Sequence, residues 1–217
     1  MARVGPMILP SILSASHLRL KELLEPLHGV APMLHVDLED GVFVPNISFG
    51  PKLIQEIYDT FGFALDVHYM VREPQRFIDM FADIPQEMIS YHAETGVHPR
   101  DITVPEGTLL GIAVNPDSPR LSPDILSSID FVVVMGVHPG FGGAPFEAST
   151  YETVSWYDQY RGDRELPFEI LVDGGVSRDN IRALIQAGGD HFVVGSGIFK
   201  YDPLAAYREL TTLCDDL

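Results

Sequence analysis

Eight short apolar runs recur along this chain of 217 residues, and segments with helical patterning separate them. Each run is continuously hydrophobic, which is typical of strands buried on both faces of a parallel sheet. Parallel strands need crossover connections, so this pattern constrains the chain to an α/β fold. The runs cover residues 7–9, 33–38, 63–67, 88–91, 109–114, 131–135, 168–172 and 191–194.

The segments between the runs predict six helices, several of which begin with Pro or with a capping Ser, Thr or Asp. This alternation predicts a (β/α)8 TIM barrel in a single domain of residues 1–217, with the active site at the C-terminal ends of the strands. A doubly wound sheet is the alternative, but no G-x-G-x-x-G motif follows the first run. The predicted helices are residues 17–27, 51–61, 74–81, 150–160, 178–187 and 203–214.

The unit after the fourth run departs from this pattern. Residues 95–108 contain Pro99, Pro105 and two glycines and have no apolar period, so we expect a reduced or missing helix there. Residues 124–127 allow no more than one helical turn. Because a missing helix would expose apolar barrel surface, we expect a packed loop, or a subunit contact in a homo-oligomer, to cover it.

The charge of the chain restricts its partners. The formal net charge is −17 with only 14 Lys and Arg, so we expect no nucleic acid and no anionic membrane as partner, since both require clustered basic residues. No apolar run could span a bilayer, and the first residues do not resemble a signal peptide. Cys214 is the single cysteine, which excludes an intrachain disulfide. These features indicate a cytoplasmic protein.

Polar residues end three of the predicted strands. Side chains alternate along a strand, so His35 and Asp37 share one face of the second strand, and His68 and Asp173 end two others. If these faces point to the barrel axis, the four side chains form a set of two nitrogens and two oxygens. Such a set suits one divalent zinc, iron, manganese or cobalt ion. Each residue alone would be an ordinary cap or loop residue, but four at three strand ends favour a metal site.

Glycine-rich loops follow the last three predicted strands. Glycine lets backbone N–H groups approach an anion, and the late loops of such barrels commonly bind phosphate. One glycine pair alone would indicate only a turn, whereas three clusters on adjacent loops favour a phosphate site. The clusters are Gly140-Phe141-Gly142-Gly143, Gly174-Gly175 and Gly195-Ser196-Gly197.

Lysine excludes two other barrel chemistries. The three lysines, Lys21, Lys52 and Lys200, do not lie at inward strand ends, which argues against a Schiff-base aldolase. No Asp-x-Lys-x-x-Asp arrangement follows a strand, which argues against the barrel decarboxylases.

The strand-end residues and glycine loops described above, together with several further segments, resemble the ribulose-phosphate 3-epimerase family over about residues 8–199. The resemblance implies a (β/α)8 barrel that interconverts ribulose 5-phosphate and xylulose 5-phosphate with a divalent metal. Loss of the C3 proton gives an enediolate that a metal can stabilise, and inversion requires one acid/base group on each face. The segments that carry the resemblance are residues 9–15, 35–46, 66–68, 92–94, 111–116, 135–143, 172–175 and 195–196.

The resemblance also implies roles for individual residues. Metal ligands would be His35, Asp37, His68 and Asp173, and Asp37 and Asp173 would also be the two catalytic acid/base groups. The implied substrate contacts are Ser11, His68, Gly140, Phe141, Gly142, Gly143, Asp173, Gly174, Gly175, Gly195 and Ser196.

Glu39 is the main departure from the family pattern, which usually has Met at this position; smaller departures are Val42, His138, Ala144 and the shorter residues 95–108. Alternation points Glu39 the same way as Asp37. It could then ligate the metal or raise the pKa of Asp37 by like-charge repulsion. Alternatively, because a strand's last residue is poorly fixed, Glu39 faces solvent or pairs with a loop residue.

The function expected from the sequence is metal-dependent 3-epimerisation of ribulose 5-phosphate, with a small phosphorylated ketose as the partner. Two alternatives stay open. One is 3-epimerisation of another ketose phosphate, such as allulose 6-phosphate. The other is a non-catalytic barrel that binds a sugar phosphate, which Glu39 and the shortened fourth unit leave open.

Overall fold

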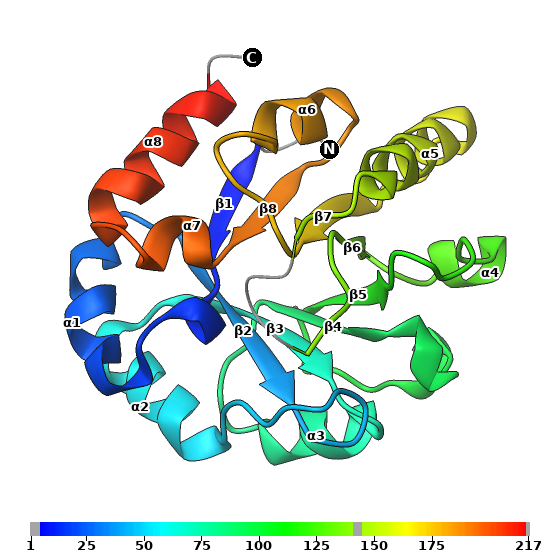
Figure 1. Cartoon of the computed structure of the whole chain (residues 1–217). Helices are drawn as coiled ribbons and strands as arrows, with labels where there is room; N and C mark the ends of the chain where they lie inside the picture. Colours follow the sequence, from blue (N-terminus) through cyan, green and yellow to red (C-terminus); the bar gives the residue numbers. More distant parts are fainter. Residues whose placement is uncertain (1–4, 141–144, 216–217) are drawn as a thin grey trace.

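The computed structural model describes residues 5–140 and 145–215, which form a barrel of eight parallel strands surrounded by helices (Figure 1). The strand order is β1-β8-β7-β6-β5-β4-β3-β2, and a parallel bridge between Ser11 and His35 joins the two end strands. The predicted (β/α)8 barrel is therefore confirmed. The strands are β1 (Met7–Pro10), β2 (Met33–Glu39), β3 (Ala64–Met70), β4 (Met88–His92), β5 (Leu109–Val114), β6 (Phe131–Met135), β7 (Glu169–Asp173) and β8 (His191–Val194).

The helices follow the strands much as the sequence predicts. Differences occur at the ends of the elements: the predicted helix 17–27 is a short α-helix between two 3-10 turns, η2 (His17–Arg19) and η3 (Glu25–Leu27). Pro26 has no N–H to donate, which favours the tighter turn at that end. The α-helices are α1 (Leu20–Leu24), α2 (Pro51–Phe61), α3 (Pro74–Met80), α4 (Pro123–Leu126), α5 (Ser149–Arg164), α6 (Ile181–Gln186), α7 (Ser196–Phe199) and α8 (Pro203–Asp215).

Helix α6 begins three residues later than the sequence predicts. The side-chain oxygen of Asn180 accepts a hydrogen bond from the Ser177 N–H at 2.8 Å, and its amide donates to the Gly175 carbonyl at 3.0 Å. These two bonds hold residues 177–180 in a turn, because an Asn side chain can replace a backbone partner.

The unit after β4 has no α-helix between residues 93 and 108, as expected, and contains only the 3-10 turns η4 (Ala93–Thr95) and η5 (Pro99–Asp101). A packed loop takes the place of the helix. Gln75 of α3 accepts from the Thr103 N–H at 2.7 Å and donates to the Thr103 carbonyl at 3.1 Å. The buried Tyr91 hydroxyl donates to the Val97 carbonyl at 3.1 Å, so this loop covers the outer face of β4.

The barrel interior determines which strand residues reach the site. A buried apolar cluster fills the interior and includes Phe131, Met135 and Leu171. Leu171 therefore points inward, and Asp173, two residues further along β7, lies on the same face of the strand. The polar end of the barrel is thus a continuation of its apolar interior.

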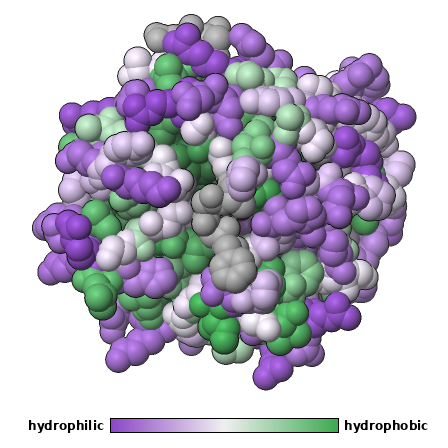
Figure 2. All heavy atoms as spheres, in the orientation of Figure 1, coloured by the Kyte–Doolittle hydropathy of each residue, from purple (hydrophilic) through white to green (hydrophobic). Residues whose placement is uncertain are grey.

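Hydrophilic side chains cover much of the molecular face in Figure 2, and apolar ones form smaller patches among them. Within residues 5–140 and 145–215, no helix has both the length and the hydropathy that crossing a bilayer requires.

Candidate functional site

The four predicted metal ligands converge at the C-terminal end of the barrel. His35 and Asp37 come from β2, His68 from β3 and Asp173 from β7, and all four are buried. One potential ligand atom of each lies within 4.8 Å of those of the other three. His35 Nε2 lies 3.2 Å from Asp37 Oδ1 and 3.7 Å from Asp173 Oδ2, and His68 Nδ1 lies 3.8 Å and 3.3 Å from the same two oxygens.

These spacings fit a small divalent cation. Four ligands bound tetrahedrally to zinc, at bond lengths of about 2.0–2.1 Å, lie about 3.4 Å from one another. The four separations of 3.2–3.8 Å are close to that value without rearrangement of the backbone. Two imidazoles with two carboxylates also suit iron, manganese and cobalt.

Asp66 orients the first imidazole. Its Oδ2 lies 2.7 Å from His35 Nδ1, and both side chains are buried. Because a carboxylate only accepts, His35 Nδ1 carries the proton, so the other ring nitrogen is the one that faces the cluster.

His92 and Glu94 orient the second imidazole in the same way. Glu94 Oε2 lies 3.1 Å from His92 Nδ1, and His92 Nε2 lies 3.0 Å from His68 Nε2. Burial lowers the pKa of His92 to about 4, whereas hydrogen bonds lower the pKa of Glu94 to about 2 against the effect of burial. A neutral His92 that donates to Glu94 must accept from His68 Nε2–H. His68 Nδ1 therefore keeps its lone pair, directed at Asp37 and Asp173.

The cluster has an excess of negative charge. Burial opposes protonation of His35, yet Asp37, Asp66 and Asp173 together raise the pKa of His35 well above its usual value. Burial likewise opposes ionisation of Asp37, but His35 and His68 lower its pKa below the usual value. The site therefore favours a positive charge at its centre, which either a proton on His35 or a bound cation supplies.

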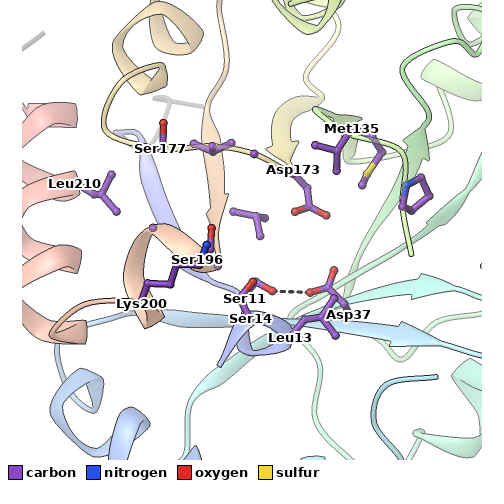
Figure 3. Close-up of a pocket in the computed structure, with 18 of the residues that line it drawn as sticks. Ser11, Leu13, Ser14, Asp37, Met135, Asp173, Ser177, Ser196, Lys200 and Leu210 are labelled. Carbon is purple, nitrogen blue, oxygen red and sulfur yellow. Dashed lines mark hydrogen bonds between the residues drawn. The ribbon is translucent and has the colours of Figure 1, made fainter. Parts of the chain in front are cut away.

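A cavity of about 460 Å³ opens beside the cluster (Figure 3). The Ser11 hydroxyl donates to Asp37 Oδ2 at 2.6 Å, and Asp173 points toward Asp37 from the opposite side. Most predicted substrate contacts line this cavity, whereas His68 is fully buried and is not part of the lining. Phe141, Gly142 and Gly143 lie outside the described residues. The predicted contacts in the lining are Ser11, Gly140, Asp173, Gly174, Gly175, Gly195 and Ser196.

Glycine is needed at the turn after β7. Gly174 and Gly175 have φ angles of +98° and +68°, a region that other residues rarely adopt. A Cβ atom on Gly174 would lie 2.6 Å from Val137 Cγ2, and one on Gly175 would lie 2.9 Å from Phe146 Cβ. These backbone groups therefore reach the cavity wall only because no side chain is present.

Glu39 points into the barrel, so the alternative in which it faces solvent is wrong, whereas the expected pairing with a loop residue is present, because the Asn46 amide donates to Glu39 Oε2 at 2.7 Å. It is the last residue of β2, is only 3% exposed and lines the cavity. Burial, and secondly the charge of Asp37, raise the pKa of Glu39 to about 7. The predicted repulsion thus raises the pKa of Glu39 and not that of Asp37, whose pKa is lowered.

No role in the site was assigned from the sequence to Asp66, His92 or Glu94. Asp66 lies on the same strand face as His68, and His92 ends β4, so strand alternation indicates that both approach the cluster. Glu94 lies in a 3-10 turn, where no periodicity applies. Arg178 and Lys200 contribute basic side chains to the cavity lining from loops after β7 and β8.

A (β/α)8 barrel with two carboxylates facing one another in a cavity at the C-terminal ends of its strands has the architecture of a barrel enzyme that transfers protons. Residues 7–199 match the model of the ribulose-phosphate 3 epimerase family. The chain is 36% identical over 208 residues to the ribulose-phosphate 3-epimerase of Mycobacterium tuberculosis, an alignment that covers 93% of this chain and 90% of the relative. It is 34% identical over 200 residues to that of Bacillus subtilis, which covers 88% and 91%. The chain therefore belongs to the ribulose-phosphate 3-epimerase family, which is a family of isomerases.

Solved structures at low identity agree on the fold. KGPDC from Streptococcus mutans superposes with a TM-score of 0.72 at 10% identity, covering 98% of this chain and 99% of that chain. Orotidine 5'-monophosphate decarboxylase from Sulfolobus solfataricus superposes with a TM-score of 0.64 at 14% identity, covering 97% and 98%.

Proposed function

We propose that this chain is a metal-dependent 3-epimerase that interconverts D-ribulose 5-phosphate and D-xylulose 5-phosphate. The observation that carries the proposal is the opposition of Asp37 and Asp173 across one cavity (Figure 3). Inversion of a carbon through a planar intermediate needs one group to remove a proton from one face and another to deliver a proton to the other face. Two carboxylates from β2 and β7 meet that requirement.

In this proposal His35, Asp37, His68 and Asp173 hold one divalent ion of zinc, iron, manganese or cobalt. When bound, the ion supplies positive charge that stabilises the negative charge developing on the oxygens at C2 and C3 as the C3 proton leaves. Asp66 and His92 keep the lone pairs of both imidazoles directed at the cluster.

Asp37 and Asp173 exchange the proton with C3. One is ionised and removes the proton, while the other is protonated and delivers one to the opposite face; in the reverse reaction they change roles. The reaction therefore requires one carboxyl group to be protonated while the other is ionised. The Ser11 hydroxyl holds Asp37 Oδ2 and so sets the direction of that carboxylate.

The phosphate is proposed to bind at the other end of the cavity. Gly174, Gly175, Gly195 and Ser196 line the cavity from the loops after β7 and β8. Lys200, which lies near Ser196 in Figure 3, adds a positive charge there. Backbone N–H groups in such loops bind anions without requiring a basic protein surface. The proposal extends to Gly140 and to Phe141, Gly142 and Gly143.

The test is solvent exchange at C3. The protein is stripped of metal, reloaded with one ion at a time and incubated with D-ribulose 5-phosphate in heavy water. We expect D-xylulose 5-phosphate and deuterium at C3, detected by NMR. Asp37→Asn and Asp173→Asn should each slow exchange by about 10²–10⁴-fold, whereas Asp79→Asn on the surface of α3 should not. A metal-loaded wild-type protein without exchange would refute the proposal.

Substrate length is tested separately. Allulose 6-phosphate is assayed beside ribulose 5-phosphate, and the pentulose should have the higher kcat/KM. Equal or higher kcat/KM for the hexulose would replace the pentulose assignment. Binding of both sugars without exchange would instead support a binding protein.

A further inference from the structure

The two carboxylate oxygens of Glu39 differ in their hydrogen bonding. Glu39 Oε2 accepts a hydrogen bond from the Asn46 side-chain amide at 2.7 Å. Among the described residues, Oε1 has no hydrogen-bond partner, although it is buried. An unpartnered polar atom in a protein interior costs free energy, so such an atom calls for a partner that binds there.

The chain holds Glu39 in place by a dedicated loop. Residues 40 and 47 pair in an antiparallel bridge, and the Gly41 N–H donates to the Asn46 carbonyl at 2.8 Å, which folds Asn46 back toward Glu39. Ser48 Oγ accepts from the Glu39 N–H at 3.0 Å and donates to the Asp37 carbonyl at 2.6 Å. Both the backbone and one carboxylate oxygen of Glu39 are therefore fixed, which leaves only Oε1 for a ligand.

The position of Glu39 in the cavity indicates which part of a ligand it would meet. It lies beside Met70 of β3 in the strand register and one inward position beyond Asp37 on β2. The glycine clusters and Lys200 line the cavity from the loops after β7 and β8. Glu39 belongs to β2, which lies two places from β8 and three places from β7 around the eight-stranded barrel, so it approaches the cavity from a different side than the loops after those strands.

The two ends of the cavity differ in charge accordingly. A carboxylate would repel a phosphate group, whereas it is a strong acceptor for a hydroxyl. A sugar phosphate whose phosphate lies against Lys200 and the glycine loops would turn its other end, which carries a hydroxymethyl group, toward Glu39.

We propose that Glu39 determines substrate specificity by accepting a hydrogen bond from the C1 hydroxyl of the ketose phosphate. The inference rests on the proposed epimerase function and identifies how the site recognises the unphosphorylated end of its substrate. A buried acceptor that requires a hydroxyl rejects an analogue without it, because the acceptor would then remain unpaired.

The experiment compares two substrates that differ only in this hydroxyl. The kcat/KM values for D-xylulose 5-phosphate and 1-deoxy-D-xylulose 5-phosphate are measured by deuterium exchange at C3 with wild-type protein, Glu39→Met and Glu39→Gln. Met is similar in length to Glu and fits beside Met70. We expect the wild type to prefer the hydroxylated sugar by at least about 100-fold. Glu39→Met should lower kcat/KM for that sugar by about 10–100-fold and change the 1-deoxy sugar by less than about 3-fold. Glu39→Gln retains an oxygen acceptor, so its kcat/KM for D-xylulose 5-phosphate should lie between the values of the wild type and Glu39→Met.

Met70→Leu is the matched control, because Met70 also lines the cavity but has no strong acceptor for a hydroxyl hydrogen bond. It should change kcat/KM for both sugars by the same factor. The inference is overturned if Glu39→Met affects both sugars equally or neither. It is also overturned if Glu39→Gln lowers zinc affinity by more than about 100-fold, which exceeds the effect of a residue that only orients a ligand and would make Glu39 a metal ligand.

Binding is measured in parallel by calorimetry with the same two sugars. Suppose that the wild type binds the hydroxylated sugar more tightly, that Glu39→Met does not, and that neither protein exchanges the C3 proton. This result would support the inference and refute the epimerase function. A wild-type protein that epimerises both sugars equally well would support the epimerase function and refute the inference about Glu39.

Discussion

His92 Nε2 lies 3.0 Å from His68 Nε2, and the two imidazole rings are stacked with their centroids 4.9 Å apart. His92 is held in turn by Glu94, whose other oxygen accepts from the Asn115 N–H at 2.8 Å and from the Ser118 hydroxyl. This chain of hydrogen bonds runs from the loop after β5 to the cluster. It leaves His68 Nδ1 as an acceptor atom directed at Asp37 and Asp173.

Glu94→Gln should therefore weaken metal binding without removing a metal ligand. The amide is a weaker acceptor than the carboxylate and can also donate, so His92 no longer has one enforced tautomer. We expect the dissociation constant for Zn²⁺ or Co²⁺, measured by competition with a chelator, to rise by about 10–100-fold. Glu73→Gln, which alters an exposed ion pair with Arg76, should leave the metal dissociation constant unchanged. Equal affinities of Glu94→Gln and wild type would contradict this role.

Asp66→Asn should act on the other imidazole. Asp66 is one of three carboxylates that raise the pKa of His35, so its replacement removes negative charge 2.7 Å from His35 Nδ1. The pKa of His35 in the metal-free protein should fall, which NMR titration of the imidazole can follow. Zinc affinity should fall with it, by about 10–100-fold. An unchanged His35 titration would show that Asp66 does not set its charge.

The strands were predictable because burial on both faces leaves a continuous apolar run, and this signal is local. The convergence of the four candidate metal ligands was predictable for a similar reason: period-two alternation, applied to His35, Asp37 and Asp173, already places them on the inner face. The late start of α6 was not, because the Asn180 turn depends on a particular pair of hydrogen bonds. Helix α7 (Ser196–Phe199) is too short to show a helical period.

The environment of Glu39 could be predicted only in part. Alternation gives its direction, but its contact with Asn46 requires the loop to fold back across seven residues. The contact of Glu94 with the site likewise depends on residues 115 and 118 of a later unit. Such contacts join distant parts of the chain through irregular backbone, where no periodic pattern reports them.

Protonation of His92 should reduce the stability of the folded protein as the pH falls. Its pKa is lowered from 6.5 to about 4 in the folded state, so the unfolded chain binds a proton first as the pH falls. The contribution of His92 to stability is complete above pH 6.5 and is lost as the pH falls toward 4, by up to about 3 kcal/mol. Glu94, whose pKa is lowered to about 2, adds a further loss as the pH falls from 4.5 toward 2.

Urea unfolding of the metal-free protein between pH 8 and pH 4 measures this dependence. His92→Asn should be less stable than wild type at pH 8 but lose less stability on acidification, because the group with the lowered pKa is gone. His98→Asn serves as control, since His98 forms a more exposed pair with Asp124. Glu39, whose pKa is raised to about 7, gains stability over the same range as the pH falls, so the comparison of the two proteins is what tests His92. Equal losses of stability on acidification in His92→Asn and wild type would contradict the assignment.

Substitution of Arg161, a buried charged residue outside the site, should strongly destabilise the fold. It is 2% exposed and forms ion pairs with Asp158 and Asp190. It also donates to the carbonyls of Phe168 at 3.0 Å and Gly188 at 2.9 Å, and so connects α5 to the residue before β7 and to the loop between α6 and β8. Removal of one partner of a buried ion pair leaves the other charge without compensation, which typically costs about 3–5 kcal/mol.

Arg161→Met should accordingly lower the free energy of unfolding in urea by about 3–5 kcal/mol. Arg164→Met is the matched control on the same helix. Arg164 is exposed and lies 3.9 Å from the centroid of the Tyr160 ring, a contact worth about 0.5–1 kcal/mol at such sites. Asp190→Asn in the Arg161→Met background should restore part of the loss, because it removes the carboxylate left without its partner. Equal losses in the Arg161 and Arg164 variants would show that the buried pair adds nothing beyond a surface contact.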